Sequence, residues 1–424
     1  MISLDTYIEI NGKQRKAGKI EGNTYLDARF SYDAEYMSSE DGAPLSISLP
    51  FQKEPFSAEK TKNFFESLLP EGFSRKAVAD WIKTDEYDYL AILKALGKEC
   101  LGAIKIGETD DNDKKHYEKL SLEEVKALAA EGATKSTRIL METHLSLTGA
   151  SGKVGLLYNE DNKEWYLPKG EAPSSHIVKQ SHVRLNHIVL NEQLCMLAAK
   201  ALGLTVPETF ILDLGNGRDD EVLYATKRYD RLVGEGEVVD GIVSPIRLHQ
   251  EDFAQAMGIS AANKYEKEKK GYLKGMFEII QNNSANPIED KRKLLEYIVF
   301  NYLIGNTDCH VKNYSLLYDK DLKSVRLAPA YDIVATQVYN TTTEMSFFIG
   351  DEIDINNIDR SSFINCSNEL GLSSVMVGKV FDKVASKFNS SLQSATESLM
   401  KLGYAEAENI QKKILKTGGC RRYV

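Results

Sequence analysis

The sequence predicts an α+β fold built from more than one domain. Strand-like runs and short helix-like segments share residues 1–105, and strand-like runs dominate residues 139–232. From about residue 246, apolar residues recur with helical spacing as far as Lys416. The length of 424 residues exceeds what one hydrophobic core usually supports, and an apolar content of 42% suffices to fill several cores.

The composition narrows the class of protein. A formal net charge of -9 leaves no basic footprint over the whole chain, so nucleic acid is not the expected direct partner. The apolar runs are shorter than a membrane span, and the first residues lack the pattern of a secretion signal, which predicts a cytoplasmic protein. The five cysteines are scattered without a Cys-x-x-Cys pair and are expected to be reduced thiols: Cys100, Cys195, Cys309, Cys366 and Cys420.

Composition shifts divide the chain into expected domains. The first should hold short strands around "LSISLP" (45–50) and a helix over 57–72 that stops at Pro70-Glu71-Gly72. The charged stretch 108–120 is expected to be a surface linker. The expected domains are an N-terminal subdomain over 1–107, a nucleotide-binding core over 139–232 and a helical lobe over 246–424.

One helix is expected among the strands of residues 139–232. It should start after a capping Asn186 and end at Gly203. Glu192 on this helix has apolar neighbours on two sides, and a carboxylate in such a place needs a cationic partner. Lys179 in the strand-like "HIVKQ" is the candidate partner, although a lysine in a strand more often extends to the surface.

The segment "NYLIGNTDCHVKN" (301–313) places polar residues directly after an apolar helix that ends at Gly305. Asp308 and Asn313 have the D-x-x-x-x-N spacing of a kinase catalytic loop, and Asp332 follows a predicted hairpin where a further magnesium ligand would stand. The alternative is that Asp308 and Asn313 merely cap turns, as these residue types often do. The helix before the pair and the hairpin after it favour the kinase interpretation.

A Gly-Ala-Ser-Gly-Lys turn at 149–153 precedes an apolar strand, so backbone N–H groups there could approach phosphate oxygens. It is not a Walker loop, and an ordinary glycine hairpin is the alternative. Cys309 and His310 suggest thiol or metal chemistry, but no second His or Cys lies near them in sequence. We expect His310 to stabilise the loop or contact phosphate.

Taken together, these motifs resemble the HipA family of bacterial serine/threonine protein kinases, the toxins that pair with HipB antitoxins. The resemblance covers nearly the whole chain, in matching order: "LSISLP", "FFESLLPEG", "SLTGASGK", "HIVKQ", "NEQLCMLAAKALGL", "KRYDR", "RLHQEDFAQAMG", "GNTDCHVKNYSLLY" and "LAPAYDIVAT". It implies a bilobal kinase-like fold, with a mixed α/β N-terminal lobe that bears an extra subdomain and an all-helical C-terminal lobe.

The resemblance also implies roles for individual residues. Asp308 would be the catalytic aspartate, and Asn313 and Asp332 would bind Mg²⁺. Ser146 would be the autophosphorylated serine whose modification expels the phosphate loop, although Thr148 offers a second hydroxyl nearby. The expected ATP contacts are Thr148, Gly149, Ala150, Ser151, Gly152, Lys153, Lys179, Lys227, Arg228, Tyr229, His310, Asn313, Tyr331 and Asp332.

Two positions depart from the family pattern. Ser151 stands where family members usually have Gln, and Lys227 where they often have Glu. Contacts made there by backbone N–H groups should survive both changes, whereas contacts that depend on the family's usual side chains should differ.

The implied partners are ATP, Mg²⁺, a HipB-like helix-turn-helix antitoxin, DNA mainly through that antitoxin, and a protein substrate of the aminoacyl-tRNA synthetase class. Two rival functions stay open: a kinase that acts on a small molecule, and a catalytically silent corepressor. The C-terminal "KTGGCRRYV" is expected to be a frayed terminus, with a local basic DNA contact as the alternative.

Overall fold

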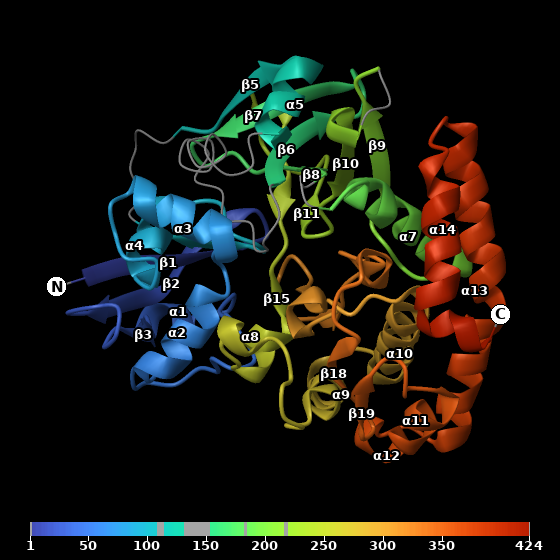
Figure 1. Cartoon of the computed structure of the whole chain (residues 1–424). Coiled ribbons are helices and arrows are strands. Elements are labelled where there is room, and N and C mark those ends of the chain that lie inside the picture. The colour runs from blue at the N-terminus through green and yellow to red at the C-terminus, as the bar shows by residue number, and fades with distance from the viewer. Residues whose placement is uncertain (1, 108–113, 131–152, 182–184, 216–218, 424) are drawn as a thin grey trace. The chain divides into compact units, whose positions relative to one another are not determined.

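The computed structural model describes residues 2–107, 114–130, 153–181, 185–215 and 219–423 (Figure 1). Helices and strands are both abundant in it, as the α+β prediction requires. The chain divides into two compact units. Unit 1 comprises Met1–Gln180, Ala225–Ala261 and Leu317–Ser324, and unit 2 comprises Ser181–Tyr224, Ala262–Leu316 and Val325–Val424.

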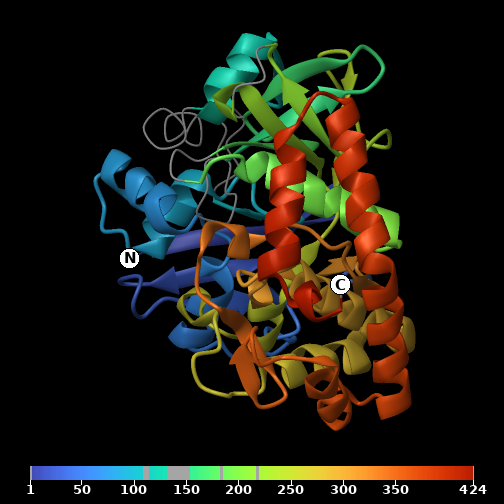
Figure 2. The same ribbon diagram turned by 45° about the vertical axis from the view of Figure 1, so that its right-hand side comes forward.

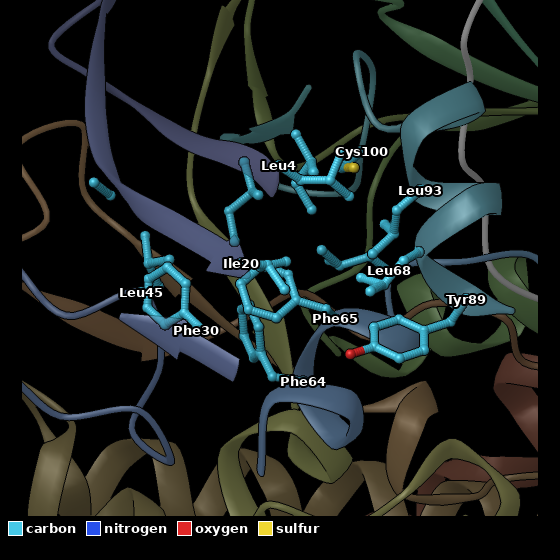
Figure 3. Packing of buried hydrophobic residues seen from close by; sticks show 14 of the residues in the cluster. Leu4, Ile20, Phe30, Leu45, Phe64, Phe65, Leu68, Tyr89, Leu93 and Cys100 are labelled. Atoms are coloured by element: carbon cyan, nitrogen blue, oxygen red, sulfur yellow. The ribbon is translucent and has the colours of Figure 1, made fainter. Parts of the chain in front are cut away.

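Unit 1 begins with a four-stranded sheet in the order β3-β2-β1-β4. Its strands are β1 (Ile2–Ile10), β2 (Lys13–Gly22), β3 (Arg29–Tyr32) and β4 (Ile104–Ile106), and every pairing is antiparallel. Alternate side chains of β1, including Leu4 and Ile8, are buried because successive residues of a strand face opposite sides. Figure 3 shows Leu4 packing with Ile20, Phe30 and Phe65 in the core of this part.

The helices beside this sheet are α1 (Ala34–Ser38), α2 (Ala58–Glu66), α3 (Gly72–Trp81) and α4 (Tyr89–Leu96). The expected helix after Ser57 is present, and the Ser57 side chain accepts a hydrogen bond from the Lys60 N–H as its cap. Its predicted end is wrong, because α2 stops at Glu66 and Gly72 opens α3. The strands expected at 45–50 are also wrong: that segment makes a single bridge between Ser46 and Leu49.

A second sheet of unit 1 has the order β5-β7-β6-β8-β10. Its strands are β5 (His116–Leu120), β6 (Lys153–Asn159), β7 (Glu164–Lys169), β8 (His176–Gln180) and β10 (Val222–Lys227), whose last three residues belong to unit 1. Helix α5 (Leu122–Ala130) follows β5. Because β5 pairs antiparallel with β7, the expectation that 108–120 is a linker is wrong for these five strand residues.

The rest of unit 1 consists of short elements. These are β11 (Arg231–Leu232) paired with β14 (Ile246–Arg247), β12 (Val238–Val239) paired with β13 (Ile242–Val243), β15 (Gln250–Asp252) and the capping-box helix α8 (Phe253–Met257).

Charged side chains buried in unit 1 join these short elements to the first sheet. Glu99 lies 2.8 Å from a guanidinium nitrogen of Arg231 and also pairs with Arg247 and, at 3.5 Å, with Arg228. Arg247 reaches Glu9 on β1 at 3.4 Å. Glu99 therefore faces three cations and Glu9 faces one, an arrangement that offsets the cost of burying charge.

Unit 2 is mostly helical. Its long helices are α7 (Ile188–Leu202), α9 (Tyr272–Asn283), α10 (Pro287–Ile304), α13 (Ser374–Lys401) and α14 (Glu406–Thr417), with α11 (Arg360–Asn365) and α12 (Ser367–Leu370) between them. Helix α13 packs against α7, α10 and α14, and Figures 1 and 2 show α13 and α14 side by side. The strands of unit 2 are β9 (Thr209–Asp213), β17 (Val325–Leu327), β18 (Glu344–Ile349), β19 (Glu352–Asp354) and the first two residues of β16 (Ser315–Tyr318), whose last two belong to unit 1. In the parts of the chain that the structure describes, no helix combines the length and apolar character needed to cross a membrane.

The C-terminal segment is packed, so the expectation of a frayed terminus is wrong for residues 418–423. Cys420 is buried, and the Tyr423 ring lies 5.3 Å from the ring of Phe381. A Cβ atom on Gly419 would lie 2.5 Å from ring carbons of Tyr302, so only glycine lets the tail approach α10 this closely.

We expect the buried carboxylate of Glu99 to make stability depend on pH. Burial raises the pKa of Glu99, but the three guanidinium groups outweigh burial and hold the pKa at about 2. A carboxyl with a lowered folded-state pKa stabilises the protein above its unfolded pKa, and this contribution is lost as the pH falls toward the folded value. The free energy of unfolding should therefore fall by about 3 kcal/mol from this group between pH 5 and 2.

Glu99→Gln should lower the free energy of unfolding at pH 7 by about 3–5 kcal/mol, because the arginines lose a buried partner. It should also flatten the acid dependence measured by urea denaturation. The control is Glu164→Gln, which removes an exposed partner of Lys119 and should change little. Equal stability of the two variants at pH 7 would contradict this account.

Candidate active site

The polar loop starts where helix α10 ends. Gly305 has a φ of 79°, and its N–H donates to the carbonyls of Asn301 and Tyr302. Glycine adopts this left-handed conformation without the steric cost that a Cβ brings, so it ends the helix and turns the chain sharply. The helix end predicted at Gly305 is confirmed, and the loop leaves from a helix that is buried along most of its length.

Two asparagines hold the backbone on either side of this turn. The buried Asn306 side chain donates from Nδ2 to Oδ1 of Asn301 at 2.7 Å and accepts from the Asp308 N–H at 3.1 Å. The Thr307 N–H donates to Oγ1 of Thr336 at 2.8 Å. Asp308 is therefore fixed at its backbone while its side chain is exposed. The roles of these two asparagines were not predicted from the sequence, although the motif "NYLIGN" contains both.

Asn313 lies in the same turn as Asp308. Its side-chain Nδ2 donates to the Asp308 carbonyl at 2.8 Å, and its own N–H donates to the His310 carbonyl at 2.8 Å. The loop thus binds the nitrogen of the Asn313 amide and leaves the amide oxygen turned away from the Asp308 carbonyl. Mg²⁺ binds oxygen atoms, so this amide oxygen is the atom of Asn313 that would bind the ion.

Tyr331, which directly precedes Asp332, contacts residues before and after Asn313. Its hydroxyl donates to the Lys312 carbonyl at 2.8 Å and lies 2.6 Å from Oγ of Ser315. The strands β16 and β17, which the sequence predicted as a hairpin, deliver the chain to this point. Tyr331 therefore acts here through its hydroxyl on the loop backbone.

Asp332 itself has a φ of 55°, in the left-handed region. A residue with a Cβ seldom adopts this conformation, and such strain persists only where the surroundings impose it. Strain of this kind is concentrated at functional sites, so it supports a role for Asp332 beyond packing.

Helix α7 carries Glu192 and is bound to the segment that follows Asp332. Asn191, which is fully buried, donates from Nδ2 to the Ala335 carbonyl at 3.1 Å and accepts from the Ala335 N–H at 3.0 Å. Glu192 beside it is 4% exposed. Lys179 belongs to unit 1, and its pairing with Glu192 stays a prediction.

The start of α7 differs from the predicted one. The N-cap is His187, which has a φ of 59°, so the expected cap at Asn186 is wrong. The His187 N–H donates to the Asp219 carboxylate at 2.8 Å, so a residue distant in sequence stabilises this helix start. The predicted end at Gly203 is confirmed, with a φ of 98°.

In unit 1, the strand lysines face each other. Lys153 on β6 is the direct antiparallel partner of Lys179 on β8, and Lys179 is 8% exposed. Like charges opposite each other on neighbouring strands are unfavourable in themselves. The predicted loop residues Thr148, Gly149, Ala150, Ser151 and Gly152, and the predicted phosphorylation site Ser146, lie outside the described residues.

The predicted hinge residues have side chains occupied within unit 1. Lys227 pairs with Glu160 at 2.7 Å, and the Tyr229 hydroxyl donates to Gln250. The Arg228 guanidinium is buried in its pair with Asp230. Contacts from Arg228 to a nucleotide would therefore have to come from its backbone.

The residues that suggested thiol or metal chemistry are also placed. Burial raises the pKa of the Cys309 thiol to about 12, so this cysteine is not a thiolate nucleophile at neutral pH. His310 is 7% exposed, and its ring lies edge-on to Tyr265 at 5.2 Å between centroids. His310 is thus part of the packing of the loop.

Comparison with known proteins agrees with this architecture. Residues 8–107 match the HipA N-terminal domain, and residues 145–392 match the HipA-like C-terminal domain. The protein Y4mE of Sinorhizobium fredii is 32% identical over 368 residues, which cover 84% of each chain. The serine/threonine-protein kinase toxin HipA of Shewanella oneidensis is 26% identical over 401 residues, which cover 91% of this chain and 88% of that protein.

A solved structure from Shewanella oneidensis MR-1, a toxin–antitoxin complex of HipA, HipB and operator DNA, contains a chain that matches with a TM-score of 0.78. The match has 22% sequence identity and covers 99% of this chain and 97% of that chain. The mixed α/β architecture and this match define a protein with a protein-kinase-like fold. The family matches then specify the group: this chain belongs to the HipA family, as the sequence motifs predicted.

We predict that Asn191→Ala destabilises unit 2 by about 2–4 kcal/mol, because it removes two buried hydrogen bonds between its side chain and the backbone of Ala335. The free energy of unfolding from urea denaturation measures the effect. Lys200→Ala, at an exposed position of the same helix, is the matched control and should change stability by less than about 0.5 kcal/mol. Similar values for the two variants would show that the Asn191 hydrogen bonds do not stabilise this junction.

Proposed function

We propose that this protein is an ATP- and Mg²⁺-dependent serine/threonine protein kinase and the toxin of a type II toxin–antitoxin pair. The observation that carries the proposal is the turn of unit 2 in which the Asn313 amide is bound to the Asp308 carbonyl while Tyr331 anchors the neighbouring Asp332. Phosphoryl transfer needs a carboxylate at the acceptor hydroxyl and oxygen ligands for Mg²⁺, and Asp308, Asn313 and Asp332 would supply these groups.

In the proposed mechanism, Asp308 orients the acceptor hydroxyl and takes its proton. The side chain is exposed, as access for a protein substrate requires, and the backbone is held by Asn306. The acceptor oxygen forms a bond to the γ-phosphorus of ATP as the bond to the β-phosphate breaks and ADP leaves. Positioning accounts for most of the rate in this class of reaction, so the rigid loop is the main contribution of the chain.

Asn313 and Asp332 would hold Mg²⁺. One carboxylate and one amide oxygen suit this ion, which prefers oxygen ligands and keeps several waters or phosphate oxygens. The ion would neutralise charge on the β- and γ-phosphates. The strained backbone of Asp332 and the bound nitrogen of the Asn313 amide both fit fixed ligand oxygens.

The lysines of unit 1 fit the nucleotide phosphates. Lys153 and Lys179 stand opposite each other on neighbouring strands, and triphosphate is the anion that the family resemblance implies for them. The loop 148–152 would add backbone N–H donors, and residues 227–229 would serve as hinge against adenine. The pairing of Glu192 with Lys179, and the three domains expected from the sequence, are part of this proposal.

The proposed partners follow from the relatives. Because the solved relative is a complex with HipB and operator DNA, we propose a HipB-like helix-turn-helix antitoxin as partner. This protein would contact DNA mainly through that antitoxin. The proposed location of both is the cytoplasm. The proposed target is a translation-related protein such as an aminoacyl-tRNA synthetase, whose phosphorylation would arrest growth. A silent corepressor or a small-molecule kinase is the alternative, and the arrangement around Asp308 favours catalysis over the first.

The decisive variant is Asp308→Asn. It removes the proton acceptor but keeps the size of the side chain, so phosphate incorporation from ATP into protein and growth arrest should both be lost, by at least about 100-fold for the former. The measurement is phosphoproteomics after brief expression beside radiolabel transfer in vitro. Asp161→Asn, on an exposed turn of unit 1, is the control.

If the Asp308→Asn variant still transfers radiolabelled phosphate into protein, the proposed role of Asp308 is refuted. Labelling of a metabolite fraction in place of protein would favour the small-molecule alternative. Antitoxin binding by wild-type protein that transfers no phosphate would favour the corepressor.

We also expect autophosphorylation at Ser146 to inactivate the kinase. A phosphoserine dianion beside the phosphate-binding loop would repel the nucleotide phosphates, and the single negative charge of Ser146→Glu should repel them in the same way, weakening ATP affinity by about 10-fold in equilibrium binding. Mass spectrometry of protein incubated with ATP, using Ser146→Ala and Thr148→Ala, identifies the modified hydroxyl. Unchanged ATP affinity of the phosphorylated protein would refute the proposed switch.

A further inference from the structure

A tyrosine from a distant segment reaches the proposed catalytic carboxylate. The Tyr265 hydroxyl donates a hydrogen bond to Oδ1 of Asp308 at 2.5 Å. Tyr265 follows the short turn Ala261–Asn263 and precedes α9. It lies 43 residues before Asp308 in sequence. The segment "ANKYEKEKKGY" that contains it shows no periodicity or motif that would single out this tyrosine.

The ring of Tyr265 packs against His310 of the catalytic loop. Its edge-on contact with His310 has a centroid distance of 5.2 Å and an interplanar angle of 83°, the T-shaped geometry that aromatic rings favour. The Lys264 ammonium lies 5.4 Å from the Tyr265 ring centroid, within cation–π range. His310 is buried and stands two positions after Asp308, so the phenol is oriented by a fixed neighbour of the carboxylate.

The backbone next to Tyr265 is anchored by Glu266. This buried side chain accepts backbone N–H donors through Oε1 at 2.6, 2.6 and 3.1 Å and through Oε2 at 3.0 Å. The donors are Lys270, Gly271, Tyr272 and Phe348. Several backbone donors on one carboxylate hold a loop firmly because each is a charge-assisted hydrogen bond.

The same anchor reaches the catalytic loop through Ser346. The Glu266 N–H donates to the Ser346 carbonyl at 2.8 Å, and the Ser346 hydroxyl donates to the carbonyl of Thr307 at 2.7 Å. Thr307 directly precedes Asp308. The backbone beside Tyr265 and the backbone beside Asp308 are therefore tied to one residue of β18, and the phenol–carboxylate hydrogen bond closes a ring of contacts within unit 2.

We propose that Tyr265 is a positioning residue for the phosphoryl transfer at Asp308. This inference rests on the proposed function, because it gives Asp308 the task of orienting the acceptor hydroxyl. Asp308 has an exposed side chain, and an exposed carboxylate samples several orientations in water. A phenol whose ring and backbone are both fixed restricts the carboxylate to one orientation before substrate arrives, which removes an ordering cost from the reaction.

An opposite role is a plug, in which the phenol occupies the place of the acceptor hydroxyl and must leave before substrate binds. The two roles predict opposite signs when the hydroxyl is removed. Tyr265→Phe keeps the ring that contacts His310 and removes the hydroxyl that donates to Asp308, so it separates the two roles with little change in packing.

The experiment uses the full-length protein and measures the initial rate of phosphate transfer from radiolabelled ATP into the protein fraction of an ATP-depleted host lysate. At saturating ATP, Tyr265→Phe should lower the rate about 10- to 100-fold, the scale of a lost hydrogen bond to a charged group. The ATP concentration at half-maximal rate and the thermal midpoint should stay at the wild-type values, because the phenol acts on the acceptor side.

Tyr272→Phe is the matched control. The Tyr272 hydroxyl donates to the Asn263 carbonyl at 2.7 Å and so supports the same segment without reaching Asp308. Its rate should stay within about twofold of wild type. An equal fall in both variants would mean that the segment matters only for its structure, and an unchanged or faster rate in Tyr265→Phe would overturn the positioning role.

Asp308→Asn separates failure of this inference from failure of the proposed function. If Asp308→Asn is inactive while Tyr265→Phe matches wild type, the proposed function stands and the role of Tyr265 falls. If Asp308→Asn retains activity, both fall together.

Discussion

The left-handed turn at Gly305 is the constraint on which the proposed active site depends. A buried helix that ends inside a protein leaves carbonyls without helical partners, and these must be satisfied locally. Gly305 turns the chain so that its own N–H and that of Asn306 bind the last turn of α10. The asparagine and threonine side chains then satisfy the next backbone groups, which explains why polar residues follow an apolar helix so closely.

The C-terminal tail reinforces this turn from the other side. The Cα of Gly418 lies 3.1 Å from where a Cβ on Gly305 would stand, so the close approach adds to the positive φ in favouring glycine there. Residues more than one hundred positions apart thus meet at the base of the loop. Helix α10 and the tail form a rigid base on which the loop side chains can be placed with little freedom.

Local patterns in the sequence predicted the parts of the structure that local chemistry determines. The ends of α7 and α10 at glycines, and the hairpin before Asp332, follow from turn residues and apolar spacing. The start of α7 was missed because its N–H partner is Asp219, thirty-two residues away, and its cap is a histidine in a conformation that sequence seldom signals. Strand β5 and the packed tail were missed for the same reason, since a charged segment gains its structure from a partner elsewhere in the chain.

The candidate site shows the same division. Asp308, Asn313 and Asp332 were predicted because phosphoryl transfer requires those residue types at that spacing. The burial of the Arg228 guanidinium beside Asp230 was not predicted, because no local feature of the sequence signals it, and the contact of this residue with adenine stays a prediction. Tyr265 was missed because only the fold brings it to Asp308.

Hydrogen bonds on both sides of Asp332 support its strained backbone conformation. Its left-handed backbone costs about 1–3 kcal/mol, which the fold must offset through neighbouring contacts. Those contacts are on both sides: Tyr331 binds the loop at Lys312, and Ala335 is held in both directions by Asn191 of α7. Because α7 also carries Glu192, a change in the position of this helix would act directly on the backbone beside Asp332. Two hydrogen bonds between Asn191 and Ala335 thus join helix α7, which carries Glu192, to the backbone three residues after Asp332.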